Sequence, residues 1–313
     1  MNRAIWDQPG ATGPVVDLID TELAQQGRVR TGPPELVRRW SISTVLLIPT
    51  DQGPVWFKAV PPVFAHEGAL ARWVASAQPR HAAAVLGSGP GWLLTEGLPE
   101  GGRDGTGRQE GPLAAAVRVQ RASIGRSAEL IALGCPERSP ARITADLDLL
   151  VDRTDLLGGP EAQGLVAALP ELTRLLEEAD GDGTPTVLVH GDIQEENALW
   201  TGRSWALIDW TDAALTHPFA ELARPLMQAT PGQRARAEAE FTQAWADVLS
   251  PRAVSRALRL APVLGAAHQV GNYVRIVEAV GATDGLDALL REWVRRLLAA
   301  AARTAPRPAR GMM

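Results

Sequence analysis

The chain has 313 residues, of which 45% are hydrophobic, and a net charge of −5 at pH 7. Single cores stop growing near ~250 to 300 residues, so we expect two parts. The acidic balance argues against a nucleic-acid partner, and the single cysteine, Cys135, excludes an internal disulfide framework. We find neither a signal-peptide pattern nor a run near the ~18 apolar residues of a membrane span, which favours a cytoplasmic protein.

Residues 1–97 are expected to be rich in strands. Apolar and β-branched residues mark strands at 36–40, 44–49, 55–60 and 92–98. Glu67 opens a segment with apolar residues at helical spacing, which predicts a helix packed on the sheet. Most of the chain after residue 113 is expected to be helical, and the fold class predicted is therefore α+β.

Lys58 stands out in this first part because it is the only lysine among 31 Lys and Arg residues. A lysine kept in a chain that otherwise uses arginine indicates a place that needs a compact point charge, such as a phosphate-binding site. It lies on the strand 55–60, and Glu67 begins the next helix, so we predict an ion pair between them. The alternative is a surface lysine and a glutamate favoured by the helix dipole.

Residues 190–197, with the sequence HGDIQEEN, are the most informative segment, and Asp209 follows in the sequence LIDW. A buried strand at 186–189 and a hairpin formed by 198–208 would bring Asn197 beside Asp209. Asp192 would accept the proton of an attacking hydroxyl, and Asn197 and Asp209 would bind Mg²⁺ through oxygen atoms. This spacing is typical of phosphoryl transfer, in which the protein positions the acceptor and neutralises charge.

The pattern H-G-D, then Asn, then I-D-W, with the sequence HPFAELA at 217–223, resembles the aminoglycoside phosphotransferase and choline kinase superfamily of small-molecule kinases. Gln194 resembles the choline kinases at its position, whereas Asp209 followed by Trp resembles the antibiotic kinases. The resemblance implies a protein-kinase-like two-lobed fold. Its N-lobe, at 1–97, would have an antiparallel sheet and bind nucleotide, and its C-lobe, at 98–313, would be mainly helical and carry the catalytic loop and the substrate-binding helices.

The same resemblance implies further nucleotide contacts, with ATP or GTP as the phosphoryl donor and Mg²⁺ as the cofactor. The end of the strand 92–98 would be the hinge, where the main chain of Glu96 and Leu98 contacts adenine, and the Gly-rich stretch 100–108 would follow as an irregular loop. A polar turn stands where kinases carry a Gly-rich loop, and its residues could contact phosphates or form a hairpin without a ligand; these residues are Ser41, Ser43 and Thr44.

Candidates for contact with the acceptor are polar side chains in or after the motif, namely Glu195, Glu196, Asp212, His268 and Tyr273. Each has a structural alternative: the two glutamates can be solvated surface groups, Asp212 can cap a helix, and the polar groups near His268 can join helices. His190, His217 and Glu221 are interpreted as supports of the catalytic loop rather than as chemical groups.

The predicted function is transfer of the γ-phosphoryl group of ATP or GTP to a hydroxyl of a small molecule, with an antibiotic or related natural product favoured. Choline, a sugar or another metabolite is the alternative acceptor. Seven Arg against four acidic residues in 251–296 favour an acceptor less cationic than an aminoglycoside. Two other classes stay open: a nucleotide-binding pseudokinase-like module, and a metal-dependent hydrolase that uses His190, Asp192 and Glu195.

Overall fold

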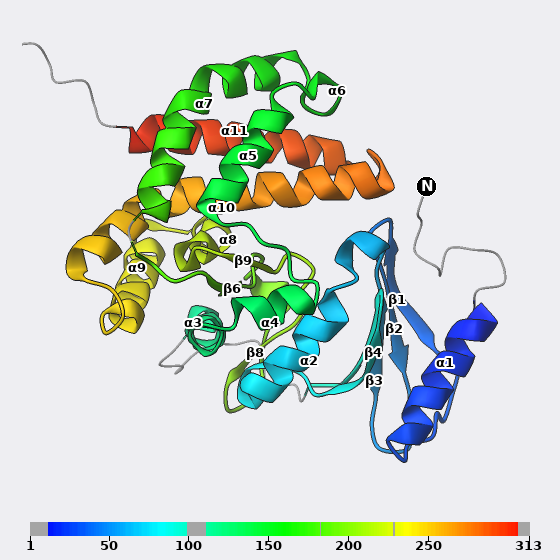
Figure 1. Cartoon of the computed structure of the whole chain (residues 1–313). Coiled ribbons are helices and arrows are strands. Elements are labelled where there is room, and N and C mark those ends of the chain that lie inside the picture. Colours follow the sequence, from blue (N-terminus) through cyan, green and yellow to red (C-terminus); the bar gives the residue numbers. More distant parts are fainter. Residues whose placement is uncertain (1–11, 99–110, 182, 228, 306–313) are drawn as a thin grey trace, which may run out of the picture.

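The computed structural model describes residues 12–98, 111–181, 183–227 and 229–305. Its first part is built on a five-stranded antiparallel sheet with the strand order β1-β2-β3-β5-β4 (Figure 1). The strands are β1 (Glu35–Trp40), β2 (Ser43–Ile48), β3 (Val55–Ala59), β4 (Val85–Gly89) and β5 (Trp92–Glu96). Every strand expected from the sequence is present. β4 was not expected, because its sequence VLGSG contains two glycines, and glycine weakens a strand signal.

Two helices cover the sheet, one on each face (Figure 1). The expected helix α2 (Glu67–Ala77) lies on the face toward the rest of the molecule. The helix α1 (Thr12–Gln25) covers the outer face, where Val15, Ile19 and Leu23 form one apolar stripe against the sheet. The expectation of a strand-rich region missed α1, although these three residues recur every fourth position, as on one helical face.

The second part is mainly helical. Its helices are α3 (Pro112–Ala122), α4 (Ser127–Ala132), α5 (Pro140–Leu150), α6 (Thr154–Leu157), α7 (Gly159–Asp180), α8 (Ala223–Leu226), α9 (Pro231–Trp245), α10 (Pro251–Val280) and α11 (Leu286–Thr304). Short strands pair as β6 (Val187–Val189) with β9 (Ala214–Thr216), and β7 (Ala198–Trp200) with β8 (Trp205–Leu207). Single turns of 3-10 helix occur at η2 (Pro62–Phe64), η3 (Pro79–His81), η4 (Glu195–Asn197) and η5 (Pro218–Leu222).

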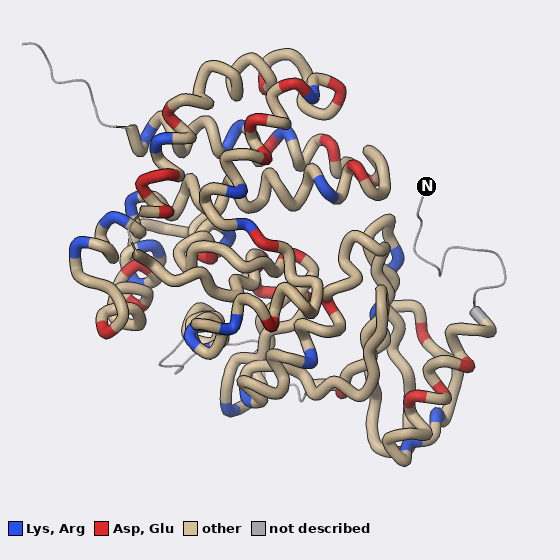
Figure 2. Tube along the Cα trace, viewed as in Figure 1, with Lys and Arg blue, Asp and Glu red and all other residues tan. Residues whose placement is uncertain are grey.

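The helical part has two cores. One surrounds β6, β9 and α9, and the other lies between α5, α7, α10 and α11. The middle of α10 is buried on nearly all sides because α7 and α11 cover one side and η5 the other. Figure 2 shows acidic and basic residues intermixed along these helices. The core around β6 also holds the start of residues 190–197, so the loop predicted to be catalytic is suspended from a buried strand as expected.

The predicted fold class, with an antiparallel sheet followed by a mainly helical part, is confirmed. The lobe boundary after residue 97 stays a prediction, because the connection from β5 to α3 runs through residues 99–110, outside the described residues. The expected Gly-rich loop at 100–108 falls in that segment. Among the residues that the structure describes, no helix is both long and apolar enough to cross a membrane.

Candidate active site

Lys58 lies at the centre of the candidate site and joins the two parts of the molecule. It faces Leu93 across β3 and β5, in the middle of the sheet. Its Nζ lies 2.7 Å from Glu67 Oε1, at the start of α2, and 2.8 Å from Asp209 Oδ1, which follows β8. The ion pair predicted between Lys58 and Glu67 is therefore present, and Asp209 adds a second carboxylate to it.

Burial and charge act in opposite directions on these three groups. Burial alone would lower the pKa of Lys58, but Asp209 and Glu67 together hold that pKa well above its ordinary value. At Glu67, burial and the charge of Asp209 raise the pKa more than Lys58 lowers it, and the pKa rises to about 7. Lys58 and the Thr211 hydroxyl outweigh burial at Asp209, whose pKa falls to about 2. At neutral pH, Asp209 is thus the firmly ionised one of the two carboxyl groups.

Asn197 and Asp209 come together through the predicted hairpin. Ala198 pairs with Leu207 in β7 and β8, and the Ile208 amide donates to the Asn197 carbonyl at 3.0 Å. Asp209 follows at once with φ of 67°, in the left-handed region that few residues other than glycine adopt. Such strain persists where the surroundings fix it, commonly at functional sites. Here it coincides with the bonds from Asp209 to Lys58 and Thr211.

Asp192 is bound by three side chains. Asn197 Nδ2 donates to Asp192 Oδ2 at 2.8 Å and to its carbonyl oxygen at 3.0 Å, and Gln194 Nε2 donates to Oδ2 at 2.9 Å. Arg224 Nε forms an ion pair with Oδ1 at 2.8 Å. Burial raises the pKa of Asp192 above its ordinary value, and Arg224 opposes part of that rise. The carboxylate is thereby fixed in one orientation beside a cation.

Arg224 was not expected from the sequence. It lies on α8, and its guanidinium stands 5.2 Å from the ring centre of Trp293 on α11. Its charge also acts on Tyr273 of α10, where it opposes the rise of the Tyr273 pKa that burial causes. The four-residue helix α8 carries no periodic pattern that marks this position. The nearby sequence ELARP offered no signal beyond one more arginine in an arginine-rich chain.

The backbone of the catalytic loop is supported by Glu221 in η5. Its two carboxylate oxygens accept the amide hydrogens of His190 and Gly191, each at 2.9 Å. Burial raises the pKa of Glu221 to about 7, although these two amides oppose the rise. His190 donates from Nε2 to the Ile208 carbonyl at 2.9 Å and accepts the Asp192 amide at Nδ1. Both residues therefore act as supports, as the sequence suggested.

The residues present fit a magnesium ion. Mg²⁺ usually binds one or two protein side chains and completes its shell with phosphate and water oxygens. Asn197 gives its amide hydrogens to Asp192, which leaves its Oδ1 as the ligand atom, and Asp209 keeps Oδ2 beyond its contacts with Lys58 and Thr211. Within the described residues, no group of three or more His, Cys, Asp or Glu could hold a metal by itself. This donor set suits a metal that is shared with a phosphate-bearing ligand.

The polar residues of the turn between β1 and β2, which were predicted to contact phosphates, are mostly engaged within the protein. Ser43 and Thr44 are buried, and Ser43 Oγ accepts a bond from Trp40 Nε1 at 2.5 Å. The Ser41 amide donates to Asp284 Oδ2 at 2.8 Å, in the connection between α10 and α11. These contacts agree with the alternative of a hairpin without a ligand for Ser43 and Thr44.

The hinge residues lie at the end of β5. The Glu96 amide donates to the Ala84 carbonyl, and the Glu96 side chain pairs with Arg28. Only the carbonyl of Glu96 is therefore left to contact a nucleotide base. Leu98 is half-buried, next to the residues outside the described part. Both residues stay predictions as adenine contacts.

Three of the five acceptor candidates are partly or fully buried, namely Asp212, His268 and Tyr273, and the other two are exposed. Asp212 and Tyr273 are within electrostatic reach of Asp192 and Arg224. Burial and the charges of Asp192 and Asp209 raise the pKa of Asp212 to about 7. His268 is 1% exposed and bonds through Nε2 to the Asp212 carbonyl at 3.1 Å, so it joins α10 to the loop and has no surface for a substrate.

Glu195 and Glu196 are exposed in η4. Their side chains are open to solvent, as the alternative of surface carboxylates supposed. Nothing in the loop orients them toward Asp192 in the way that Gln194 and Asn197 are oriented. Contact with an acceptor stays a prediction for both.

Comparison with known proteins decides the family. Residues 36–254, more than half of the chain, match the model of the phosphotransferase enzyme family. The chain belongs to this family. The match includes Lys58, Glu67, Asp192, Asn197 and Asp209, and it confirms the resemblance drawn from the motif. Among curated proteins, no sequence matches the chain.

Solved structures of phosphotransferases share the fold. A macrolide 2'-phosphotransferase type I aligns with a TM-score of 0.57 at 19% identity, over 95% of this chain and 99% of that one. A choline/ethanolamine kinase family protein from Mesorhizobium loti aligns at 0.58 and 18%, over 92% and 99%. A GDP complex of aminoglycoside 2'-phosphotransferase-IIIa aligns at 0.59 and 13%, over 94% and 99%. The kinase-like fold of this phosphotransferase is thereby confirmed.

Proposed function

We propose that this phosphotransferase transfers the γ-phosphoryl group of ATP or GTP to a hydroxyl of a small molecule. The observation that carries the proposal is the contact of Lys58 Nζ with carboxylates from both parts of the molecule, Glu67 Oε1 at 2.7 Å and Asp209 Oδ1 at 2.8 Å. A lysine held in this way is suited to pair with nucleotide phosphates, and Asp209 is placed to bind the metal that the phosphates share.

The residues then have distinct roles. Mg²⁺, when bound by Asn197 and Asp209, would neutralise charge on the transferring group. Asp192 would orient the acceptor hydroxyl and take its proton, since its carboxylate is already fixed by Asn197, Gln194 and Arg224. Most of the catalysis would come from this positioning, because phosphoryl transfer needs little covalent work from the protein.

The charges around Asp192 bear on the choice of acceptor. Asp192 is paired with Arg224, and Asp212, with a pKa of about 7, is only partly ionised at neutral pH. Apart from the solvent-exposed Glu195 and Glu196, the surroundings of Asp192 thus carry little net negative charge. A polycation such as an aminoglycoside needs several carboxylates. We therefore favour an antibiotic or related natural product with few or no positive charges, and choline, a sugar or another metabolite as alternatives.

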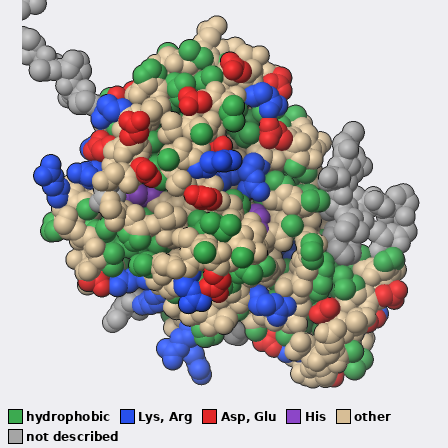
Figure 3. All heavy atoms as spheres, in the orientation of Figure 1, with side chains coloured by type: hydrophobic (Ala, Val, Ile, Leu, Met, Phe, Trp, Pro, Cys, Tyr) green, Lys and Arg blue, Asp and Glu red, His purple; other side chains and the backbone are tan. Residues whose placement is uncertain are grey.

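The arginines of α10 and α11 do not add to this argument, contrary to the expectation from composition. Most of them pair with surface carboxylates, as Arg256 and Arg259 do with Glu178 and Arg295 does with Glu161. Figure 3 likewise shows basic and acidic side chains interspersed over one face of the molecule. The preference for a less cationic acceptor rests on Arg224 instead.

Two other functions are less well supported. A pseudokinase-like module would not need Asp192, Asn197 and Asp209 to be held together with Lys58. A hydrolase that binds metal through His190 would need a free ring nitrogen, but both nitrogens of that ring are engaged.

The phosphoryl donor would be available in the cytoplasm, where we propose the protein acts. GTP stays a candidate donor because a similar fold has been solved with GDP.

Mass spectrometry of pooled hydroxylated compounds tests the proposal. The pool would hold macrolides, nucleoside antibiotics, aminoglycosides, choline and sugars, incubated with the protein and Mg-ATP or Mg-GTP. We expect one class to gain the mass of one phosphate with the native protein and not with Asp192→Asn. Thermal stabilisation by both nucleotides without any mass gain, across a broad pool, would favour the binding module.

A further inference from the structure

Arg138, in the connection between α4 and α5, is a buried cation without a counter-ion among the residues that the structure describes. It is 3% exposed, and its Nη1 donates to the His268 carbonyl at 3.2 Å. Its Nε and Nη2 contact no acceptor, and no carboxylate of the described residues forms a salt bridge with it. Burying a charge without a partner destabilises the folded state. The fold retains this cost at a residue that has no assigned part in phosphoryl transfer.

A second arginine lies beside it. Arg275 on α10 donates from Nη2 to the Val63 carbonyl at 3.1 Å, and it too lacks a salt bridge within the described residues. The Nη1 of Arg138 fills the space that a side chain at Gly271 would occupy, at 1.9 Å from an ideal Cβ, one turn of α10 before Arg275. Burial, followed by the charge of Arg275, lowers the pKa of Arg138 to about 9. The two guanidinium groups therefore repel each other.

The same two arginines act on His66, at the start of α2. Burial and then Arg275 lower the pKa of His66 to about 4, with a smaller contribution from Arg138. The His66 ring is neutral at pH 7 and bonds through Nε2 to the Thr211 carbonyl at 3.1 Å. The acidic groups whose charge favours the two arginines are Asp146 and Asp212, and neither forms a salt bridge with them.

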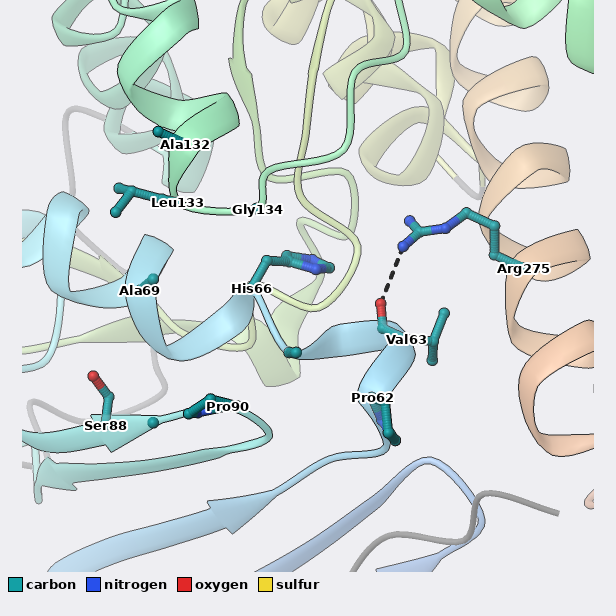
Figure 4. Close-up of a pocket in the computed structure, with 12 residues that line it drawn as sticks. Pro62, Val63, His66, Ala69, Ser88, Pro90, Ala132, Leu133, Gly134 and Arg275 are labelled. Atoms are coloured by element: carbon teal, nitrogen blue, oxygen red, sulfur yellow. Dashed lines mark hydrogen bonds between the residues drawn. The ribbon is translucent and has the colours of Figure 1, made fainter.

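Arg275 and His66 open onto a groove of about 540 Å³. Figure 4 shows both side chains directed toward the same space, between η2 and α2 on one side and the Gly134 segment and α10 on the others. Its walls include apolar side chains such as Val63 and Leu133. None of the residues assigned to phosphoryl transfer lines it, so it is distinct from the site that contains Lys58 and Asp192.

We propose that this groove binds a small anion, a phosphate or carboxylate group, with Arg275 as its direct contact and Arg138 as the buried charge behind it. An anion here would supply the counter-charge that neither arginine finds among the described residues, and bidentate binding of oxyanions is what guanidinium groups favour. The apolar walls would accommodate a small apolar body attached to the anionic group.

Thermal unfolding tests the site without knowledge of the acceptor. Inorganic phosphate, phenyl phosphate and benzoate are titrated separately at constant ionic strength, so that the arms distinguish phosphate from carboxylate and a bare ion from one with an apolar body. We expect at least one of them to raise Tm of the native protein by about 2 to 5 °C. Arg275→Gln should abolish the rise. Arg252→Gln, an exposed arginine on the same helix, should retain it.

Arg138→Met gives a second, independent test. If the cation lacks a partner, its replacement by an apolar side chain of similar length should leave Tm in anion-free buffer unchanged or raised, and it should remove the response to anions. Absence of any response in the native protein would overturn the proposal. So would a response that persists in Arg275→Gln, since the anion would then bind elsewhere, for example near Lys58. Stabilisation by Mg-ATP, measured on the same variants, reports on the transfer site separately.

Discussion

Replacing Lys58 by Met removes the cation shared by Glu67 and Asp209 and leaves the shape of the side chain nearly unchanged. Removal of one partner from a buried ion pair typically costs about 3 to 5 kcal/mol. Glu67 can reduce this cost by taking up a proton, because its pKa is already about 7 and Lys58 is the group that lowers it. Asp209 is 37% exposed, so water can compensate part of its loss. The cost should therefore depend on pH.

The direction of that dependence follows from linkage. A carboxyl group whose pKa is raised in the folded state stabilises the fold at low pH and loses that contribution as pH rises through the folded value. Without Lys58 the pKa of Glu67 rises above 7. Between pH 7 and the new value, the variant loses about 1.4 kcal/mol per pH unit relative to the native protein. The destabilisation by Lys58→Met should therefore increase from pH 6 to pH 8.5.

Thermal unfolding at pH 6 and pH 8.5 measures this effect, with roughly 2 °C in Tm for each kcal/mol in a chain of this size. The matched control is Arg30→Met, which breaks the pair of Arg30 Nη2 with Asp20 Oδ2 at 2.7 Å. That pair is partly exposed, so its loss should cost about 0 to 1 kcal/mol at both pH values. If Lys58→Met behaves like the control and shows no pH dependence, the three groups are not coupled as described.

Other changes at the site have distinct readouts. Arg224→Gln should raise the pKa of Asp192 further and so move the acid limb of the pH profile of kcat/KM to higher pH. Arg224→Lys should bring that limb most of the way back to its native position. If the limb does not move in Arg224→Gln, the pairing of Arg224 with Asp192 is refuted. Asp209→Asn should abolish Mg²⁺-dependent ADP release, as EDTA does with the native protein. Glu221→Gln places an amide NH₂ against a backbone N–H and should cost about 1 to 3 kcal/mol. The control Glu238→Gln, at a partly exposed side chain of α9, should leave Tm nearly unchanged, and equal Tm for the two would contradict the support role.

Parts of the site could be predicted because the signals are local. A strand with a lone lysine, a helix that opens on glutamate and a hairpin with a Gly-containing turn each place their residues through short-range geometry. The contact of Lys58 with Glu67 and the pairing that sets Asn197 near Asp209 follow from those elements alone. The buried strand before the catalytic loop is equally local, since its residues are all apolar.

Arg224 could not be predicted because its role is entirely tertiary. It contacts Asp192 only because η5 and α8 turn the chain back over the catalytic loop, and Trp293 and Tyr273 reach it from helices late in the sequence. Arg138 is a similar case. Its sequence context resembles a surface loop, and its burial depends on the close approach of α10 at Gly271.

Burial explains the expectations that changed. His268 lies in a polar stretch of α10 that could be a wall of the substrate site or a contact between helices. The middle of α10 is enclosed on nearly all sides, and His268 bonds to the Asp212 backbone, as the second interpretation supposed. Ser43 and Thr44 appeared as an open polar turn, whereas the two-residue hairpin makes them part of β2, where their side chains are buried. The burial of His268 and the burial of Ser43 and Thr44 both depend on which face of a helix or strand is covered by the rest of the molecule. A single sequence does not specify that face.

The most direct test of the central claim compares Asp192→Asn with the native protein on the acceptor identified by mass spectrometry. Mg-ATP binding is measured by calorimetry, and turnover by the rate of phosphorylated product. We predict a similar Kd for Mg-ATP and a turnover lower by about 10² to 10⁴ in the variant. Full turnover with Asp192→Asn would show that another group activates the acceptor and would contradict the assignment of this site.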